Sequence, residues 1–269
     1  MKSIKEIPKI LTIAGSDSIG GAGIQADIKT FSAFGCYSAS AITAITAQNS
    51  MGINGIQAVK PDIVFKQIES VLTDITPDAV KTGMLLNHKI IKIIEKAFIL
   101  FNVKNIVIDP VLVSTSGASL LNDKGQEALK KLFGLAVVVT PNLFEAEVLI
   151  KGEVKTLKQM EKAAIEIKKL GSKWVVIKGG HLNDLECIDV VYDGKNLYHL
   201  KEKKINTQNT HGSGCAFASA IAASMAKKLP VLDSIKKAKK FITMAVKESH
   251  NFSSNNGPVN HLTGVKSIW

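Results

Sequence analysis

The sequence predicts an α/β fold with three layers, in which helices cover both faces of a mostly parallel central sheet. Short runs rich in β-branched residues alternate with longer segments of helical periodicity, which is the order of repeated βαβ units. Late in the chain, Asp193-Gly194 separates two strand-like runs and is typical of a hairpin turn. No low-complexity linker divides the sequence. We therefore expect a single domain over residues 1–269, with one antiparallel pair near its end.

The predicted strands are the short β-branched runs, and the predicted helices are the longer periodic segments between them. The strands are expected at Ile10–Ala14, Ser38–Thr46, Ile56–Val59, Ala79–Thr82, Asn105–Ile108, Ala136–Thr140, Trp174–Ile177, Ile188–Tyr192 and Asn196–Lys201. The helices are expected at Gly23–Phe34, Asp62–Leu72, Lys89–Phe101, Lys124–Phe133, Leu143–Lys151, Leu157–Leu170, Gly214–Lys227 and Val231–Glu248. Pro61, directly before the second helix, is a usual start signal.

The formal net charge of +11 raises the question of nucleic-acid binding. All 34 basic residues are Lys, whereas bidentate readout of bases and phosphates depends on Arg. The Lys residues are also spread along helical stretches such as KIIKIIEKA. We therefore expect a solvated basic surface and no nucleic-acid partner.

Cysteine usage and hydropathy predict a cytoplasmic protein without a membrane partner. Cys36, Cys187 and Cys215 have no Cys-x-x-Cys spacing, which argues against a disulfide framework or a structural zinc site. No stretch approaches the roughly 18 apolar residues of a membrane span. The N-terminal sequence carries an acidic residue and a short apolar run that leads into a glycine-rich turn, so it is predicted to be the first strand and not a signal peptide.

Polar and glycine residues gather directly after the predicted strands. Ligands of open α/β sheets bind beyond the carboxyl ends of the strands, so these positions predict where a ligand lies. The first strand is followed by a glycine-rich turn over residues 15–23. Later strands are followed by Gln48, Gly83-Met84, Asp109-Pro110-Val111, Asn142 with Glu145, and Lys178-Gly179-Gly180-His181.

The first glycine-rich turn matches the dinucleotide fingerprint G-x-G-x-x-A at Gly21-Ala22-Gly23-Ile24-Gln25-Ala26. A dinucleotide site also needs an acid about 20 residues further on, to hold the ribose hydroxyls. No Asp or Glu occurs between Asp27 and Asp62, so the sequence disfavours a dehydrogenase. The P-loop pattern G-x-x-x-x-G-K-[ST] is absent as well. The turn is better explained by close approach of its backbone to another ligand.

A second glycine-rich helix start occupies His211-Gly212-Ser213-Gly214-Cys215, and the helix that follows is almost entirely small or apolar. The free N–H groups and the dipole at this helix start predict an anion site, suited to the charge of a transferred phosphoryl group. A thiol in this first turn should have a lowered pKa. The alternative is that Cys215 only packs against the sheet.

Four further polar residues each allow a structural and a functional explanation. Asp109 could bind Mg²⁺ through water or cap the next segment. Asn142 and Glu145 have the spacing of a helix capping pair, but their oxygens would also suit a Mg²⁺-water or phosphate site. Lys178 could be merely exposed, or could reach nucleotide phosphates as a point charge.

Together these motifs resemble the hydroxymethylpyrimidine/phosphomethylpyrimidine kinases of thiamin biosynthesis, a family with a ribokinase-like fold. The stretch LTIAGSDSIGGAGIQADIKTFSAFG is similar to the family's N-terminal signature. AITAQNS, KTGML, VIDPV, VTPNLFEAE, VIKGGH, NTHGSGCAFASAIAA and NNGPVNH follow in the family's order. Ser213 stands where Thr is common, Ile19 where Ser is usual and Leu112 where Met is frequent. None of these changes removes a group that the chemistry needs.

The resemblance implies a homodimer that uses MgATP to phosphorylate 4-amino-5-hydroxymethyl-2-methylpyrimidine and then its monophosphate. It assigns the substrate pocket to Gly15, Asp27 and Gln48, with Met84 and Val111 as apolar walls. It assigns the nucleotide and Mg²⁺ side to Asp109, Asn142, Glu145, Lys178 and Thr210, with Asp109 and Glu145 nearest the metal. It assigns the anion hole to Gly212, Ser213 and Gly214, with Cys215 as the catalytic residue.

A pyridoxine or pyridoxal kinase on the same scaffold is the alternative within the superfamily. Gln48 favours the pyrimidine, because its amide offers a donor and an acceptor to the exocyclic amine and ring nitrogen of an aminopyrimidine. Vitamin B6 has a phenolic hydroxyl at that place and no amine. A catalytically inactive sensor is a second alternative, which the presence of Cys215, Asp109 and Lys178 disfavours.

Overall fold

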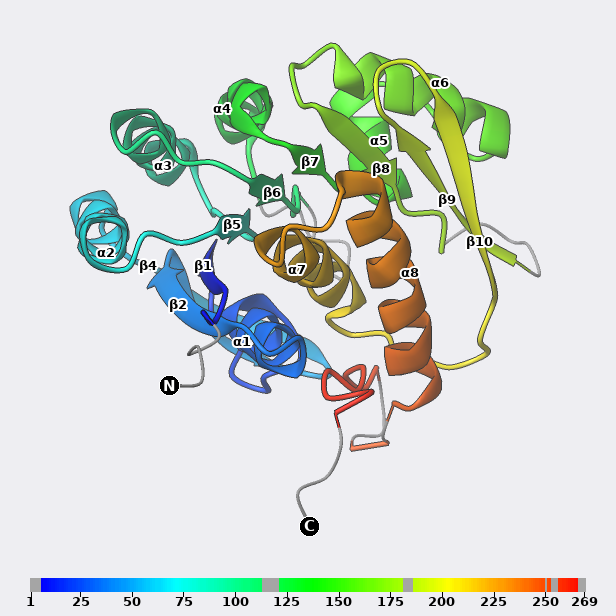
Figure 1. Ribbon diagram of the computed structural model, residues 1–269, viewed down its shortest axis with the longest axis horizontal. Coiled ribbons are helices and arrows are strands. Elements are labelled where there is room, and N and C mark those ends of the chain that lie inside the picture. Colours follow the sequence, from blue (N-terminus) through cyan, green and yellow to red (C-terminus); the bar gives the residue numbers. More distant parts are fainter. Residues whose placement is uncertain (1–5, 113–120, 181–185, 250, 253–255, 266–269) are drawn as a thin grey trace.

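The computed structural model describes residues 6–112, 121–180, 186–249, 251–252 and 256–265. The chain forms three layers, with a twisted sheet between two groups of helices (Figure 1). This arrangement confirms the predicted fold class. Among the described residues, no helix combines the length and apolar character needed to cross a bilayer.

The central sheet runs in the order β10-β9-β8-β7-β6-β5-β1-β2. Its parallel strands are β1 (Lys9–Ala14), β2 (Tyr37–Ile42), β5 (Ala79–Thr82), β6 (Ile106–Ile108), β7 (Val138–Val139) and β8 (Trp174–Ile177). β9 (Glu186–Tyr192) is antiparallel to β8 and to β10 (Leu197–Lys203). The late hairpin is therefore confirmed. Because β1 leads to β2 on one side while β5 lies on its other side, the strand order reverses between β1 and β5.

Helices cover both faces of this sheet, each over its own apolar core. One face carries α1 (Gly23–Ala33), α7 (Ser213–Ala226) and α8 (Val231–Lys247). The other carries α2 (Pro61–Asp74), α3 (His88–Leu100), α4 (Asp123–Leu132), α5 (Leu143–Ile150) and α6 (Leu157–Lys168), with a 3₁₀ turn at Phe133–Leu135. Each helix begins and ends within two residues of its predicted bounds.

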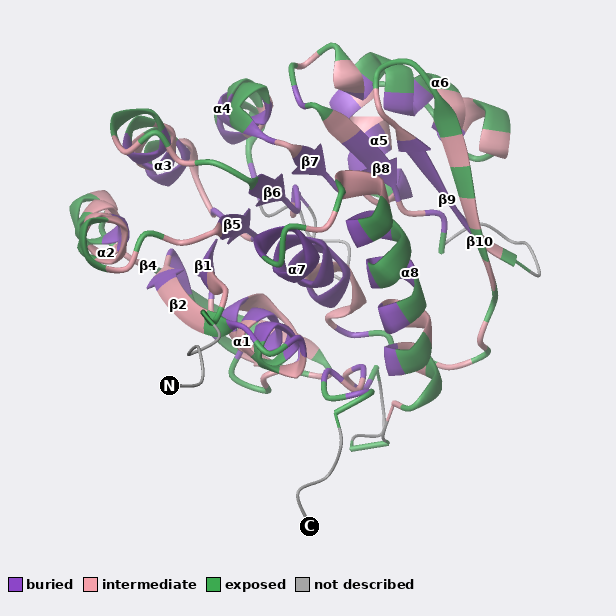
Figure 2. Ribbon diagram, viewed as in Figure 1, coloured by how far each residue is buried: buried purple, intermediate pink, exposed green. Residues whose placement is uncertain are grey.

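Helix α7 is enclosed on all sides, and every residue from 216 to 226 is buried (Figure 2). Its many alanines allow the backbone to lie close to the strands below and to α1 and α8 beside it. A helix that is apolar all round belongs in the interior. The interior position leaves its N-terminus pointing at the carboxyl ends of the parallel strands.

The strand predicted over residues 38–46 is wrong as a single element. It is broken at Thr43 into β2 and β3 (Ala44–Asn49), and β3 pairs only with β4 (Gly52–Ala58) in a separate two-stranded sheet. The side-chain amide of Gln67 bonds both the N–H and the C=O of Ile42, at 2.9 and 3.1 Å, which closes the edge of β2. Thr43 is fully buried and its Oγ1 donates to the carbonyl of Met84 at 2.7 Å. The chain therefore turns there, and β3 and β4 lie beyond the sheet.

Candidate active site

The predicted site residues come together at the carboxyl edge of the sheet. Gly15 follows β1 and Met84 follows β5, the two strands between which the strand order reverses. Such a switch point is where open α/β sheets bind ligands. A Cβ atom added to Gly15 would lie 2.4 Å from Cε of Met84, so these two residues are in contact. Only glycine leaves room for the Met84 side chain at this point.

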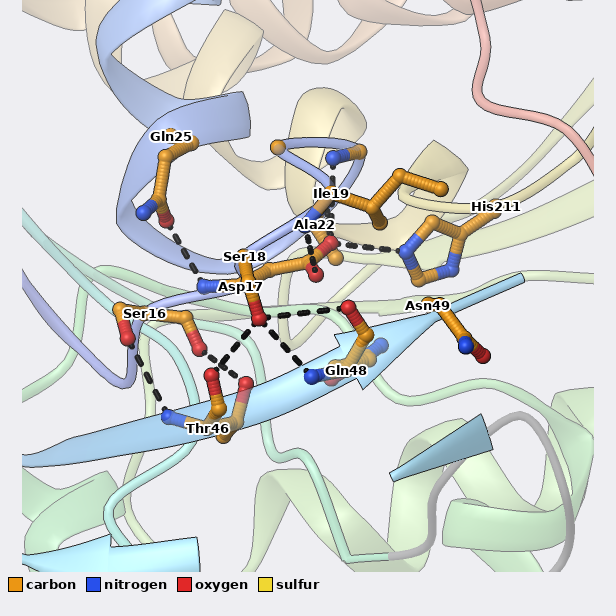
Figure 3. Close-up of polar contacts among 12 residues, drawn as sticks. Ser16, Asp17, Ser18, Ile19, Ala22, Gln25, Thr46, Gln48, Asn49 and His211 are labelled. Atoms are coloured by element: carbon orange, nitrogen blue, oxygen red, sulfur yellow. Dashed lines mark hydrogen bonds and ion pairs between the residues drawn. The ribbon is translucent and has the colours of Figure 1, made fainter. Parts of the chain in front are cut away.

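The glycine-rich turn over residues 15–23 is held in shape by the carboxylate of Asp17. Its Oδ2 accepts hydrogen bonds from the N–H groups of Gly21 and Ala22 at 3.0 and 2.7 Å, and its Oδ1 accepts one from Ile19 at 3.2 Å (Figure 3). Burial would raise the pKa of Asp17, but His211 and these backbone donors hold it below its usual value. Asp17 thus stays ionised and keeps the turn folded around it.

Strand β3 runs beside this turn and brings Gln48 to it. Oγ of Ser18 donates to the carbonyl of Thr46 at 2.8 Å and accepts from the N–H of Gln48 at 2.8 Å (Figure 3). The side-chain amide of Gln48 is half-buried and makes no hydrogen bond within the described ranges. Both its donor and its acceptor are therefore available to a ligand.

The N-terminus of α7 approaches the first turn so closely that side chains are excluded. Gly212 has a φ of 78°, and a Cβ atom there would lie 1.7 Å from the carbonyl oxygen of Gly21. No side chain caps the helix. The N–H of Ser213 donates to the carbonyl of Thr210 at 3.1 Å, whereas the N–H groups of Gly214 and Cys215 bond no described residue and are open to an anion. A Cβ atom at Gly214 would lie 3.2 Å from Nζ of Lys178, which places a cation beside them. The helix start and Lys178 therefore lie side by side at one corner of the site.

Lys178 is held at this corner by Asp109. Its Nζ lies 2.9 Å from Oδ1 of Asp109, and Oγ1 of Thr140 donates to the same oxygen at 3.2 Å. Burial would raise the pKa of Asp109, but Lys178 and then Lys81 keep it below its usual value. Oδ2 of Asp109 accepts no hydrogen bond from the described residues and lies on the side of Gly214. This free carboxylate oxygen suits a magnesium-bound water.

Asn142 and Glu145 form the capping box of α5, which the sequence offered as the simpler explanation. Oε2 of Glu145 accepts from the N–H of Asn142 at 2.7 Å, and Oδ1 of Asn142 accepts from the N–H of Glu145 at 2.9 Å. Burial raises the pKa of Glu145 to about 7, Lys178 opposes this rise and Asp109 adds to it. Glu145 therefore faces the same corner as Asp109. In the described residues, no cluster of three His, Cys, Asp or Glu could hold a metal alone. Mg²⁺ commonly binds one or two carboxylates together with substrate phosphates, so this set fits that ion.

Cys215 lies in the first turn of α7, but its thiol does not have the lowered pKa that the sequence predicted. Burial raises the pKa of Cys215 to about 11; Lys81 opposes the rise, while Asp109 and Asp27 add to it. Burial of the thiol is the main reason that the thiolate is disfavoured, and the negative charges of Asp109 and Asp27 add to it. The sequence could not place these charges beside the helix start.

Asp27 was predicted in the substrate pocket, and the structure places it beneath the pocket. It is fully buried, and its carboxylate is surrounded by protein partners. Nζ of Lys81 lies 2.8 and 3.0 Å from its two oxygens, Oγ of Ser219 donates at 2.7 Å and Oγ1 of Thr12 at 2.5 Å. These partners come from β5, α7 and β1, so Asp27 joins the elements under the site and does not face a ligand.

The remaining predicted residues lie at the rim. Thr210 is exposed and precedes the start of α7, and Val111 is half-buried near the end of the described range 6–112. His181, which ends one of the quoted motifs, lies outside the described residues. Sequence reasoning missed Lys81 and His211 as site-supporting residues, because each is paired with an acid far away in the sequence.

Fold and site together define a ribokinase-like protein: a three-layer α/β sandwich with a glycine-rich turn and a helix N-terminus meeting at the switch point. The chain is 41% identical to a Bacillus subtilis pyridoxal kinase solved as an ADP complex, with a TM-score of 0.89 over 95% of this chain and 98% of that one. The family model for phosphomethylpyrimidine kinase matches residues 17–260, and the chain belongs to this family.

Two curated relatives show the extent of the similarity. A hydroxymethylpyrimidine/phosphomethylpyrimidine kinase of Bacillus subtilis is 41% identical over 95% of this chain and 95% of its own length. A thiamine biosynthesis bifunctional protein of Geobacter sulfurreducens is also 41% identical, over 96% of this chain but 53% of its own length. The chain thus spans about half the length of the bifunctional relatives that it matches.

Proposed function

We propose that this chain transfers the terminal phosphoryl group of MgATP to 4-amino-5-hydroxymethyl-2-methylpyrimidine, and then a second one to the resulting monophosphate, in thiamin biosynthesis. The observation that carries the proposal is the meeting of the α7 N-terminus and Lys178 with the turn that begins at Gly15 and with Gln48 on the neighbouring strand β3. The α7 N-terminus and Lys178 suit a phosphoryl group, and Gly15 and Gln48 suit a heterocyclic acceptor. The family match supports the same activity.

The nucleotide side of the site is proposed to consist of Lys178, Asn142 and Thr210, with Asp109 and Glu145 toward the metal. Lys178 attracts the phosphates, and the N–H groups from Gly212 to Cys215 receive the charge that spreads over the transferred oxygens. Mg²⁺, when bound, neutralises phosphate charge and would be held by Asp109 through water. The ADP complex of the Bacillus subtilis pyridoxal kinase supports nucleotide binding by this fold.

The acceptor side is proposed to consist of Gly15, Gln48, Met84 and Val111, which leave the hydroxymethyl group pointing at the α7 start. Gln48 supplies the paired hydrogen bonds that the aminopyrimidine needs, and Met84 and Val111 supply apolar contact. We also propose a cytoplasmic homodimer. Free thiols at Cys36, Cys187 and Cys215 fit a reducing compartment, and the exposed Ile45 and Ile56 on the β3–β4 sheet fit an apolar contact between subunits.

Gln48→Ala should raise KM for the pyrimidine at least about tenfold while KM for ATP stays within about twofold. A site that hydrogen-bonds an amine loses discrimination when the bonding partner is removed. The measurement is a coupled assay with each substrate varied in turn. Asn49→Ala, an exposed neighbour on the same strand, is the matched control. An unchanged pyrimidine KM in Gln48→Ala would remove Gln48 from the pocket.

A pyridoxal kinase is the second candidate, favoured by the 41% identical Bacillus subtilis structure of that name. A panel of the pyrimidine, pyridoxal and pyridoxine, compared by kcat/KM, decides between the two. We expect the pyrimidine to be preferred, and the preference to shrink in Gln48→Ala. A higher kcat/KM for pyridoxal in the unmodified protein would overturn the proposed substrate.

Asp109→Asn should lower kcat by about 10²-fold and raise the Mg²⁺ concentration needed for half-maximal rate. The change removes the charge that pairs with Lys178 and that would attract the metal. Mg²⁺ is titrated at fixed ATP, with kcat followed in both proteins. Asp123→Asn, a carboxylate in the first turn of α4, is the control with no expected effect. Full activity of the unmodified protein in excess chelator would contradict metal dependence.

A further inference from the structure

A buried contact between Asp17 and His211 joins the two glycine-rich segments of the site. Nε2 of His211 lies 2.8 Å from Oδ2 of Asp17, and the side chains are 7% and 2% exposed (Figure 3). The two residues are 194 positions apart in the chain. Neither belongs to the groups proposed above to touch the pyrimidine, the nucleotide or the metal. The contact therefore needs a different explanation.

On the acceptor side, Asp17 is the organising centre of the first turn. Its carboxylate accepts hydrogen bonds from Ile19, Gly21 and Ala22, so moving this carboxylate moves the whole turn. The N–H of Asp17 in turn donates to Oε1 of Gln25 at 2.8 Å, which ties the turn to the first turns of α1. The position of Asp17 therefore sets the position of the backbone that follows Gly15.

On the phosphate side, His211 is fixed by its own backbone. Its N–H donates to the carbonyl of Gly257 at 3.1 Å, and its carbonyl accepts from the N–H of Val259 at 3.2 Å. His211 directly precedes Gly212, whose Cα lies against the carbonyl of Gly21. The imidazole ring is packed as tightly, because a Cβ atom at Gly21 would lie 2.4 Å from Cδ2 of His211. The ring thus reaches from the α7 start into the folded turn.

We infer that Asp17 and His211 are a positioning pair that sets the separation between the acceptor pocket and the phosphate-binding start of α7. The inference rests on the proposed function, since it assumes an acceptor at the turn and a phosphoryl group at Gly212–Cys215. In-line transfer requires the reacting atoms to be held near 3–3.5 Å, and a misplacement of about 1 Å can reduce the rate by about 10²-fold. The pair therefore affects the rate of the transfer step through geometry and leaves the affinity for ATP almost unchanged.

The test compares His211→Leu with His211→Gln. Leu fills the buried volume without a donor, whereas Gln can place an amide N–H near the position of Nε2. We expect His211→Leu to lower kcat for the pyrimidine by about 10²-fold while the Kd for a non-hydrolysable ATP analogue stays within about twofold. His211→Gln should recover most of the lost kcat. His199→Leu is the matched control, because it removes a 2.8 Å contact with Glu161 of the same chemistry at the far edge of the sheet.

Equal losses of kcat in the Leu and Gln variants would overturn the inference, and so would a loss confined to ATP affinity. Circular dichroism and Tm report whether the Leu variant is folded. If it is not, His211→Asn replaces it, because its amide reaches only the place of Nδ1 and leaves Asp17 without this donor. Absence of phosphoryl transfer in the unmodified protein would contradict the proposed function. An active protein in which kcat is unchanged by all these variants would contradict the inference alone.

Discussion

Cys215→Ala should cut the first phosphorylation by about 10²–10⁴-fold and the second much less. The hydroxymethyl group must lose a proton as it attacks, and the thiol of Cys215 is the titratable group at the helix start. The monophosphate acceptor has a second pKa of about 6 and is already mostly dianionic at neutral pH, so it needs positioning and no base. The two steps are compared as kcat/KM on purified protein, with each acceptor supplied separately.

The pH dependence of the first step gives the same prediction a second readout. Because burial raises the pKa of Cys215 to about 11, the thiolate is a minor species at neutral pH and increases with pH. For a thiolate base, kcat/KM of the first step should therefore rise about tenfold per pH unit between pH 7 and 9, and Cys215→Ala should flatten this rise.

Cys36→Ala is the control for loss of a thiol. Cys36 is buried beside α7 at the amino end of β2, whereas the site lies at the carboxyl ends of the strands. It should leave both steps unchanged. Equal losses on both steps in Cys215→Ala would mean that Cys215 shapes the anion hole and does not act as a base. Cys215→Asp should restore part of the first step only, since its charge would repel the phosphate of the second acceptor.

Breaking the Lys81–Asp27 pair should destabilise the protein by about 3–5 kcal/mol, because it leaves one buried charge without its partner. Both side chains are fully buried, at 2.8 Å from each other. Burial would lower the pKa of Lys81, but Asp27, with Cys215 and Asp109, raises it above its usual range. Lys81→Met and Asp27→Asn should each lower the free energy of unfolding measured in urea.

A double variant tests whether the loss of stability comes from breaking the pair. Lys81→Met with Asp27→Asn removes both charges, so it should be clearly more stable than the sum of the single changes predicts. Lys155→Met is the control, because its ion pair with Glu153 at 2.7 Å is two-thirds exposed on both sides and should contribute little. If the effects of the two single changes on the free energy of unfolding were strictly additive, the Lys81–Asp27 pair would not be the reason for the lost stability.

The sign of the pH dependence follows from the raised pKa of Lys81. A raised pKa in the folded state contributes stability at every pH below the ordinary value of 10.5, and this contribution is lost as the pH rises through the folded-state pKa. The stability difference between the unmodified protein and the Lys81→Met, Asp27→Asn double variant, which leaves no unpaired buried charge, should therefore be constant through neutral pH and shrink only in strong alkali.

Local sequence was sufficient for the parts of the site that follow strands or begin helices. The glycine-rich turn, the α7 start and the strand-end residues Asp109 and Lys178 all lie where the alternation of strands and helices placed them. The capping box of Asn142 and Glu145 was visible from spacing alone. These features depend on neighbours in the chain, which a sequence displays directly.

The parts that could not be predicted depend on partners far apart in the chain. Asp27 follows the glycine-rich turn as a ligand-binding acid would, and only its contact with Lys81, 54 residues away, shows that it is a buried structural group. The break at Thr43 depends on Gln67 closing the edge of β2. The raised pKa of Cys215 depends first on burial of the thiol and then on Asp109 and Asp27, all of which follow from how the sheet topology packs distant segments under the helix.

The bridge between His211 and Pro258 has a consequence for the order in which the protein is made. The acceptor turn leaves the ribosome early, yet the residue that locks it follows 194 positions later, or about 10–40 s at usual rates of synthesis. His211 itself is steadied only when Gly257 and Val259 have been added. A nascent chain can therefore complete its sheet while its turn is still unlocked, and competence for transfer would arise only after Val259 has been added. Released chains truncated just before and just after Val259 would differ in activity far more than in secondary structure.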